Sequence, residues 1–289
     1  MPIIDLHFHS NYSDGKLSVA ELATIIIKKG LKYCSLTDHD TIAGVDELKK
    51  CLNGSDTVVI PGVELTALYG ENEIHILAYD FDIKIVDKIL KERNKLVKKQ
   101  KIIEMEKAVS LFKKNGLKIT NNLEISEKKP VGYTLATDIC KQKINQDIFI
   151  KRHGKKLTLD DIYFKYQAPG KICAVDRSGV SVEWLLDKLK DGATDVIIAH
   201  PFLQTSVATS PLSENDIFSL LDMGYSGVEI YHDKTSEKRI QWLKKITNEK
   251  KLNYTGGSDF HGRKNDVGIG LYGVDLEIPN FKICNYELV

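Results

Sequence analysis

The chain has 289 residues, of which 42% are hydrophobic and 28% charged, the composition of a globular protein with a large core rather than a disordered chain or a fibrous repeat. No apolar run approaches the roughly 20 residues that a membrane helix needs, and the N-terminal residues lack the layout of a signal peptide. The five cysteines are widely spaced and form no C-x-x-C pair, so neither a disulfide framework nor a thiolate zinc site is indicated. We therefore expect a cytoplasmic protein.

The charge is balanced overall but unevenly distributed along the chain. Lysine and arginine number 41 against 40 aspartate and glutamate. Residues 85–171 hold 21 basic and 10 acidic residues, a net charge of +11, which leaves 20 basic and 30 acidic residues, a net charge of −10, elsewhere. This asymmetry predicts two parts with different roles.

The first eighty residues alternate short apolar runs with amphipathic stretches, a pattern typical of parallel strands connected by helices. Ser18 and Glu21 form the pattern of a capping box, and Gly30 is placed to end the helix that they begin. The turn at 70–72 predicts local pairing of the strand that follows it. We predict strands at 3–6, 34–37, 57–60 and 73–79, and helices at 18–30 and 45–52.

The residue pattern changes from alternating strands and helices to helices alone after residue 82. Residues 85–115 form a long lysine-rich helical stretch that ends at Gly116, and we predict further helices at 134–143 and 159–166. The alternating pattern then resumes, with helices at 184–190, 217–223 and 238–246 and strands at 196–199, 227–231 and 254–257. About seven strands interrupted by one basic helical segment indicate an α/β fold, a parallel (β/α) barrel with an insertion at 85–171. No G-x-G-x-x-G directly follows a predicted strand, so a dinucleotide-binding sheet is not indicated.

Six of the eight histidines lie at or just after a predicted strand. His7 and His9 are two residues apart on an extended segment, so both side chains leave the same face and can bind one ion. Asp259 and His261 repeat this spacing. An H-x-H pair alone arises by chance in roughly a fifth of such sequences, so its significance depends on its neighbours.

Further imidazole and carboxylate side chains lie near other strands. In (β/α) barrels the carboxyl ends of the strands meet at one face, where active sites are found. A single histidine such as His75 is more often a buried structural residue, but a set of buried polar groups needs partners, and bound metal ions would supply them. The sequence therefore predicts a metal centre whose ligands are His7, His9, Asp14, His39, Glu64, His75, His200, Asp259 and His261.

These residues lie in six short motifs, in the following order: Asp5-Leu6-His7-Phe8-His9-Ser10 with Tyr12-Ser13-Asp14-Gly15, Leu36-Thr37-Asp38-His39-Asp40-Thr41, Pro61-Gly62-Val63-Glu64, His75-Ile76-Leu77-Ala78-Tyr79, Ala199-His200-Pro201 and Gly257-Ser258-Asp259-Phe260-His261. Together they resemble the motifs of the PHP (polymerase and histidinol phosphatase) family. Within it, the chain is most similar to the stand-alone nucleotide phosphatase branch, whose barrel carries a small insertion domain. The insertion is less well matched than the barrel.

The resemblance implies a distorted (β/α)7 barrel formed by residues 1–84 and 172–289, with residues 85–171 as a helical insertion or lid. It also implies a centre of three divalent metal ions. Manganese, iron and zinc all suit imidazole and carboxylate ligands, and the sequence does not choose among them. The implied ligand sets are His7, His9, Glu64 and Asp259 for the first ion, Glu64, His75 and His200 for the second, and Asp14, His39 and His261 for the third.

Three divalent ions against three carboxylates would leave a charge of about +3 at the barrel mouth, which suits an anionic phosphate. The implied reaction is direct hydrolysis of a phosphate ester by a hydroxide held between metals, because coordination lowers the pKa of water to about 7 in favourable zinc sites. No covalent nucleophile is indicated, since the chain lacks G-x-S-x-G and a cysteine with a signature neighbourhood.

The substrate contacts are less clearly marked than the ligands. Related nucleotide phosphatases have an Arg-Pro-His motif where this chain has Lys129-Pro130-Val131. Lysine does not reproduce the bidentate phosphate recognition that arginine provides. We place Lys129 and Arg177 in the substrate site, although exposed surface roles fit both equally well or better. His232 resembles a family histidine that would position substrate or protonate the leaving oxygen, with a supporting role as the alternative. Asp38 and Asp40 flank His39, and one of them, which we take to be Asp38, would serve catalysis by orienting that ring.

The sequence thus predicts a metal-dependent phosphoesterase that acts on a small phosphorylated substrate, namely nucleoside monophosphates, 3′,5′-bisphosphates or the 5′ ends of short oligonucleotides. One alternative is a phosphatase of a small metabolite such as histidinol phosphate. Another is a non-catalytic, metal-stabilised module, although all nine ligand positions are filled. The basic segment lacks interleaved aromatic residues, so we expect no stable long nucleic-acid partner. The oligomeric state stays open.

Overall fold

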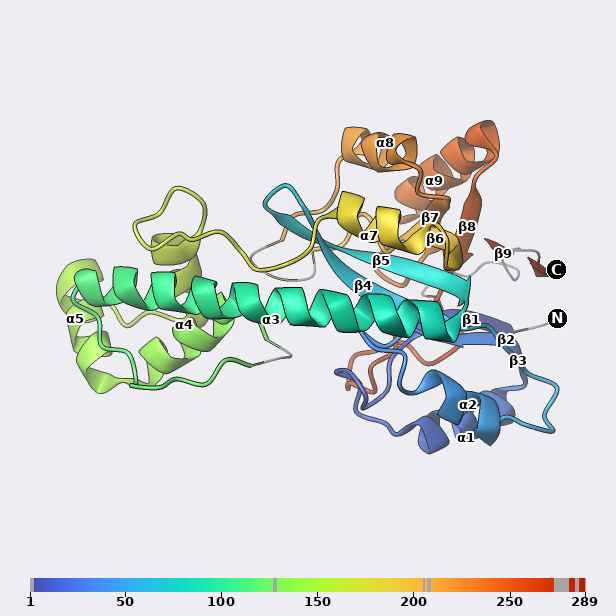
Figure 1. Ribbon diagram of the computed structural model, residues 1–289, viewed down its shortest axis with the longest axis horizontal. Coiled ribbons are helices and arrows are strands. Elements are labelled where there is room, and N and C mark those ends of the chain that lie inside the picture. The colour runs from blue at the N-terminus through green and yellow to red at the C-terminus, as the bar shows by residue number, and fades with distance from the viewer. Residues whose placement is uncertain are drawn as a thin grey trace.

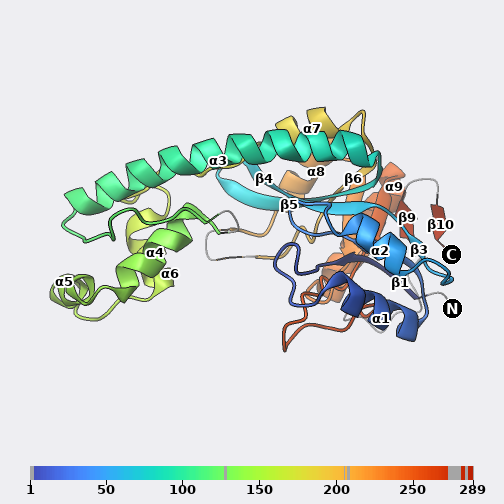
Figure 2. The ribbon, with the colours of Figure 1, turned by 60° about the horizontal axis from the view of Figure 1, so that its bottom comes forward.

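The computed structural model describes residues 3–126, 129–204, 206, 209–272, 281–283 and 286–288. Its strands form two sheets that make up one end of the molecule, and the helices of the insertion (residues 85–171) make up the other (Figure 1). One long helix runs from the first part to the second, and the two chain ends lie together at the sheet end (Figures 1 and 2).

The first sheet is parallel and has the order β1-β2-β3. Its elements are β1 (Ile3–Phe8), α1 (Val19–Lys29), β2 (Leu31–Leu36), α2 (Val45–Cys51) and β3 (Val58–Val59). The predicted capping box is present, because the Ser18 side chain accepts from the Glu21 amide and the Glu21 side chain accepts from the Ser18 amide. Gly30 ends α1 in the left-handed conformation, as predicted. Helices α1 and α2 cover one face of this sheet (Figure 2).

The second sheet has seven strands in the order β10-β9-β8-β7-β6-β5-β4. They are β4 (Gly62–Tyr69), β5 (Asn72–Phe81), β6 (Ala193–Ile198), β7 (Gly227–Tyr231), β8 (Asn253–Gly256), β9 (Phe281–Ile283) and β10 (Tyr286–Leu288). Strands β6, β7 and β8 are parallel, and helices α7 (Val182–Leu189), α8 (Glu214–Met223) and α9 (Glu237–Lys250) alternate with them.

The parallel arrangement that the alternating pattern predicted is present for only some of the strands. Strands β4 and β5 form a hairpin through the turn at Gly70, and β5 also pairs antiparallel with β6. A connection of two residues can only join antiparallel neighbours, whereas a parallel pair needs a crossover of a dozen or more residues. The predicted pairing through 70–72 is therefore present, but its partner strand β4 was not predicted.

Isolated bridges join the two sheets at two places, Phe8 to Phe260 and His39 to Glu64. The described strands do not close into a barrel. The fold is a mixed α/β architecture in which the ends of β1, β2, β4 and β8 come together, and both bridges lie at predicted metal ligands or next to them.

Helix α3 (Ile83–Lys114) connects the two ends of the molecule (Figure 1). Its first turns contribute Val86 and Leu90 to the core of the sheets, whereas Ala108 and Phe112 near its end belong to a separate core within the insertion. In contrast, Ile103 in the middle is 52% exposed. The helix thus contributes side chains to one core at its start and to the other near its end, and so connects the two cores.

The insertion contains short helices around its own apolar core. Its elements are α4 (Val131–Lys141), α5 (Lys143–His153), α6 (Leu159–Ile162) and a π-helical turn at Tyr163–Gln167. Helix α5 was not predicted, and it has almost no amphipathic pattern from which it could be recognised. Phe112, Leu135 and Phe149 are fully buried in this core. Among the described helices, none is both long enough and apolar enough to cross a membrane.

Candidate metal centre

Glu64 lies at the centre of the predicted ligands. It is fully buried in β4, in a strand rather than in the loop that the sequence indicated. One carboxylate oxygen is 2.9 Å from His75 Nδ1 and 3.0 Å from His200 Nε2. The other lies 3.1 to 3.3 Å from the nearest ring nitrogens of three further histidines, which are His39, His9 and His7. A single carboxylate is therefore surrounded by five imidazole rings.

The first group of ligands depends on close backbone contact between β1 and the segment after β8. His7, His9, Glu64 and Asp259 offer ligand atoms that lie within 4.8 Å of one another, and they are the set predicted for the first ion. The carboxylate of Asp259 is 3.2 Å from His9 Nε2. A Cβ atom at Gly257 would lie 2.3 Å from the Cβ of His7, so only glycine permits this approach.

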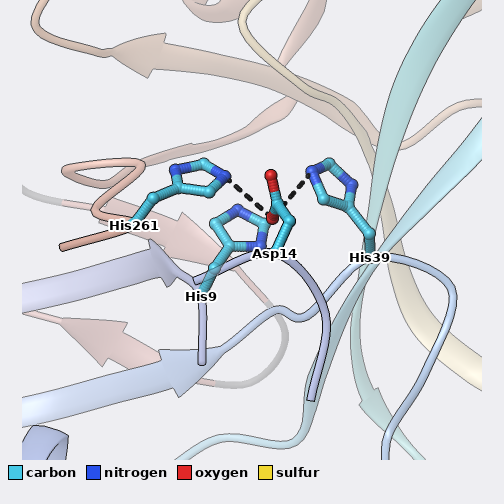
Figure 3. A group of neighbouring side chains, drawn as sticks. All are labelled: His9, Asp14, His39 and His261. Carbon is cyan, nitrogen blue, oxygen red and sulfur yellow. Dashed lines mark ion pairs between the residues drawn. The ribbon is translucent and has the colours of Figure 1, made fainter. Parts of the chain in front are cut away.

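A second group forms around Asp14 at the more exposed side of the cluster. The rings of His261 and His39 point at its carboxylate from opposite sides, and His9 lies next to them (Figure 3). His261 Nε2 is 3.2 Å and His39 Nε2 is 3.8 Å from Asp14. The loop that carries Asp14 folds tightly onto β1, because a Cβ atom at Gly15 would lie 2.6 Å from the carbonyl oxygen of His9. This group contains the predicted third set and adds His9.

A third group differs from the prediction in one member. Its mutually close atoms belong to His39, Glu64 and His75, whereas the sequence placed His200 in this set. His200 nevertheless contacts Glu64 directly and stacks on the ring of His7, with 5.7 Å between the ring centroids. All nine predicted ligands are therefore brought together, from both sheets.

The charges of the cluster are strongly coupled. Burial alone would raise the pKa of Glu64, but nearby rings, His39 and His75 foremost, hold that pKa well below its usual range. Burial would lower the pKa of His9, yet hydrogen bonds with Asp259 and Glu64 raise it to about 9. Burial and the neighbouring rings lower the pKa of His39 to about 3. The carboxylates are thus ionised, as metal ligands must be.

Several buried atoms of the cluster form no hydrogen bond of acceptable geometry among the described residues, although most of them lie 2.9 to 3.3 Å from an oxygen or ring nitrogen of a neighbouring ligand. Unpaired buried polar atoms are costly and call for an explanation such as a bound ion. These atoms are His7 Nε2, His9 Nδ1, His39 Nδ1, Glu64 Oε2 and His75 Nδ1. Because they are nitrogen and oxygen atoms that face one another, the donor set fits divalent manganese, iron or zinc.

Sequence reasoning missed a buried carboxylate that contacts the ring of one predicted ligand histidine and the backbone of another. Glu229 is fully buried in β7, and its Oε1 lies 2.9 Å from His7 Nδ1. Its other oxygen accepts a hydrogen bond from the backbone amide of His200 at 2.8 Å. A carboxylate on the second nitrogen of a ligand histidine fixes the tautomer and the ring orientation. The available signal was a lone glutamate within the apolar strand 227–231.

Asp38 is buried beside the cluster, but its hydrogen bonds lead elsewhere than predicted. Its carboxylate accepts from the backbone amide and hydroxyl of Ser10 at 2.8 and 2.6 Å, and from the hydroxyl of Ser13 at 2.5 Å. The ring of His39 instead contacts Glu64 and Asp14. Asp38 therefore holds the loop that carries Asp14, and its effect on His39 is indirect.

His232 lies against the edge of the cluster. Its Nε2 is 3.3 Å from Asp259, and its Nδ1 is 3.1 Å from Asp233. Burial would lower the pKa of His232, but the hydrogen bond with Asp259 and the charges of Glu229, Asp259 and Asp233 raise it. The backbone amide of Lys234 donates to Nδ1 at 3.2 Å, so Nε2 is the ring nitrogen that faces Asp259 and could carry a proton toward the cluster.

The two predicted basic contacts lie farther from Glu64. Arg177 forms an ion pair with Glu73 at 3.1 Å, two residues before His75 on β5. Lys129 belongs to the insertion, where its ammonium group lies 5.2 Å from the ring centroid of Tyr133. Arg177 is therefore close to the cluster, and Lys129 is not part of it.

Comparisons with known proteins agree with this arrangement. The PHP domain profile matches residues 5–156. The chain is 26% identical to the 5′-3′ exoribonuclease of Haemophilus influenzae over 95% of this chain and 96% of that protein. It is 23% identical to the 3′,5′-nucleoside bisphosphate phosphatase of Chromobacterium violaceum over 90% of this chain and 88% of that protein. A solved structure assigned as a metal-dependent phosphoesterase from Bifidobacterium adolescentis superposes with a TM-score of 0.60 at 20% identity, covering 98% and 92% of the two chains.

Proposed function

Because the chain belongs to the PHP domain family, we propose that its cluster of histidines and carboxylates is the active site of a metal-dependent hydrolase of nucleotide phosphate esters. The observation that carries the proposal is the convergence of nine nitrogen and oxygen donor residues, with five histidine rings around buried Glu64 and several donor atoms without a hydrogen bond. Hydrolysis of phosphoric esters is also the reaction class of the relatives that match most of the chain.

We assign the ions to the three groups of ligands, with Glu64 shared between two of them and His9 and His39 at the boundaries. Divalent ions held there would polarise a phosphate ester and activate the attacking water. Glu229 would keep His7 in the tautomer that presents Nε2 to an ion, since the carboxylate occupies Nδ1. His232 would hold the proton that the leaving oxygen needs. The proposed number of ions is three.

We propose a nucleotide as the substrate, either a nucleoside bisphosphate or the 5′ end of a short oligonucleotide. The names of the two relatives support both possibilities, because one acts on RNA and the other on nucleoside bisphosphates. Arg177 would contribute a positive charge near the site from its position beside Glu73. Lys129 lies in the insertion beside the ring of Tyr133, so it would contact only a part of the substrate that extends to the insertion.

We also propose that residues 1–84 and 172–289 form the catalytic body, in which the two sheets together make a distorted barrel. Residues 85–171 would act as a lid. The separate apolar cores at the two ends of α3 support this division, although the first turns of α3 pack against the sheets. A cytoplasmic location stays a prediction.

The direct test is phosphate release by manganese-loaded protein from adenosine 3′,5′-bisphosphate, 5′-AMP and histidinol phosphate. His9→Ala should abolish release, whereas His153→Ala, which removes a histidine of the insertion outside the cluster, should retain it. Preference for the adenosine compounds supports the proposed substrate, and preference for histidinol phosphate would replace it with a metabolite. Metal binding with no release from any of the three would contradict the proposal and favour a structural module.

A further inference from the structure

A large cavity lies between the insertion and the tip of the β4–β5 hairpin. Its volume is about 890 Å³, near the upper end of the range of roughly 300 to 1,000 Å³ that small-molecule sites occupy. The hairpin side is formed by the turn around Gly70 and by Asn72, whose side chain is joined to the backbone of Ser210 by two hydrogen bonds of 2.8 and 2.9 Å. The cavity is thus bounded on one side by the β4–β5 hairpin of the second sheet and on the other by the insertion.

Aromatic side chains line the insertion side of this cavity. Tyr133 comes from α4, and Tyr163 and Phe164 come from the π-helical turn. Tyr133 and Phe164 are 46% and 54% exposed, so their rings are available to a ligand. Gln167 donates a hydrogen bond of 3.1 Å to the carbonyl of Gly132, which holds the π-helical turn against α4. The sequence indicated no aromatic platform, because these rings are about thirty positions apart and meet only in the fold.

The charges of the lining are unsuited to a phosphate group. The described lining residues include four carboxylates, one arginine and no lysine, and the carboxylates are Glu71, Glu104, Asp160 and Asp176. Arg177, the arginine, is already paired with Glu73. Aromatic rings together with hydrogen-bond acceptors instead suit nucleobases, which have flat π faces and amino or imino donors. Lysines lie outside the lining, and Lys129 is next to the ring of Tyr133 at 5.2 Å.

Strand β5 connects the lining of the cavity with the metal centre. Asn72 lines the cavity and His75 belongs to the centre, and three residues of extended strand span about 10 Å. A small hollow beside His75 and His200 shares Ser210 with the cavity. A strand whose terminal phosphate lies at the metal centre can therefore extend into the cavity.

We propose that this cavity binds the downstream nucleobases of a single-stranded oligonucleotide, by stacking on Tyr133 and Phe164, while its 5′ phosphate lies at the metal centre. The proposal rests on the proposed function and names its substrate class, an oligonucleotide of several residues. Backbone phosphates pass along the rim, where Lys129 lies, and the bases point inward to the aromatic rings and carboxylates. A mononucleotide substrate would leave most of the cavity unused.

The test measures binding rather than turnover. The probe is a 5′-phosphorylated, phosphorothioate-linked pentaribonucleotide with a 3′ fluorophore, and its control is the matched abasic strand with the same phosphates. Fluorescence anisotropy with manganese-loaded protein gives the Kd of each. Because stacking contributes about 1 to 3 kcal/mol per base, we expect Tyr133→Ala and Phe164→Ala each to weaken binding by about tenfold. Ile144→Ala, an equally exposed apolar residue on α5 outside the lining, should bind as the unchanged protein does.

The outcomes separate this inference from the proposed function. Weaker binding of the abasic strand and of both aromatic variants supports the cavity even if no phosphate is released. Equal binding of the two strands, or unchanged binding by both variants with unchanged melting temperatures, would overturn the inference even if the chain hydrolyses adenosine 3′,5′-bisphosphate. A variant that fails to fold is replaced by Phe164→Leu, which keeps the apolar volume and removes the ring.

Discussion

In the metal centre, six histidine rings and two aspartates surround a fully buried carboxylate, whereas in the insertion partly exposed aromatic rings surround a large cavity. The centre uses rigid strand ends and strained backbone, since His200 and Asp259 have φ angles of 21° and 50°. The insertion uses short helices packed on an apolar core of their own. The difference shows that the candidate ligands are fixed by the sheets, whereas the cavity is bounded by a part with an apolar core of its own.

A substitution that leaves a cavity in the core of the insertion tests whether the two cores are independent. Phe112 is fully buried there, so Phe112→Ala should destabilise this core by about 3 to 5 kcal/mol. We expect faster hydrogen exchange in α4 and α5, with unchanged exchange in the sheets and retained metal content. Mass spectrometry of exchanged peptides provides the measurement, with exposed Ile150→Ala as the control. Loss of metal in Phe112→Ala would show that the two parts are one cooperative unit.

Removal of the central charge should affect the metal centre alone. Glu64→Gln keeps the size of the side chain but removes the anion that five rings face, so metal affinity and phosphate release should each fall by more than about a hundredfold, beyond the usual cost of an outer-shell change. Metal competition titrations and phosphate assays would measure this. Glu249→Gln, at an exposed position, is the matched control. Full metal affinity in Glu64→Gln would refute a shared ligand role.

The orienting role of Glu229 predicts a smaller loss. Glu229→Gln can still accept from the His200 amide, but it no longer stabilises the ring of His7 through a charged contact. We expect a loss of about 10- to 100-fold in metal affinity, with the helical content unchanged. Isothermal titration with manganese would compare it with Glu214→Gln, whose carboxylate is half exposed and pairs with Arg239. Equal affinities would leave His7 oriented by β1 alone.

The smallest effect is expected where the centre meets solvent. Arg263 is half exposed and its guanidinium contacts Asp14, so without an ion it occupies the carboxylate that a metal needs. Because exposed pairs contribute about 0 to 1 kcal/mol, Arg263→Ala should raise metal affinity by less than about fivefold. The same titration measures this. Weaker metal binding in Arg263→Ala would mean that this arginine supports the site rather than competing with its ligands.

The sequence predicted which side chains come together better than it predicted the fold around them. His7 and His9 could be paired because alternate residues of a strand share a face, and the structure brings both to Glu64. Glu229 was missed because a single carboxylate in a strand has no spacing pattern. The antiparallel hairpin of β4 and β5 was only half predicted, because the 62–69 segment was not assigned as a strand although its residues 63, 65, 67 and 69 alternate as apolar positions. The aromatic cavity depends on contacts between Tyr133 and the π-helical turn that only tertiary packing creates.

The central claim is that the nine converging residues bind divalent ions at the sheet ends. Anomalous diffraction from crystals of the manganese-loaded chain tests it most directly. The account predicts anomalous peaks within the groups around Glu64 and Asp14, in contact with His9 and His39. Manganese bound elsewhere, or no peak among these residues in protein that is fully folded, would contradict it.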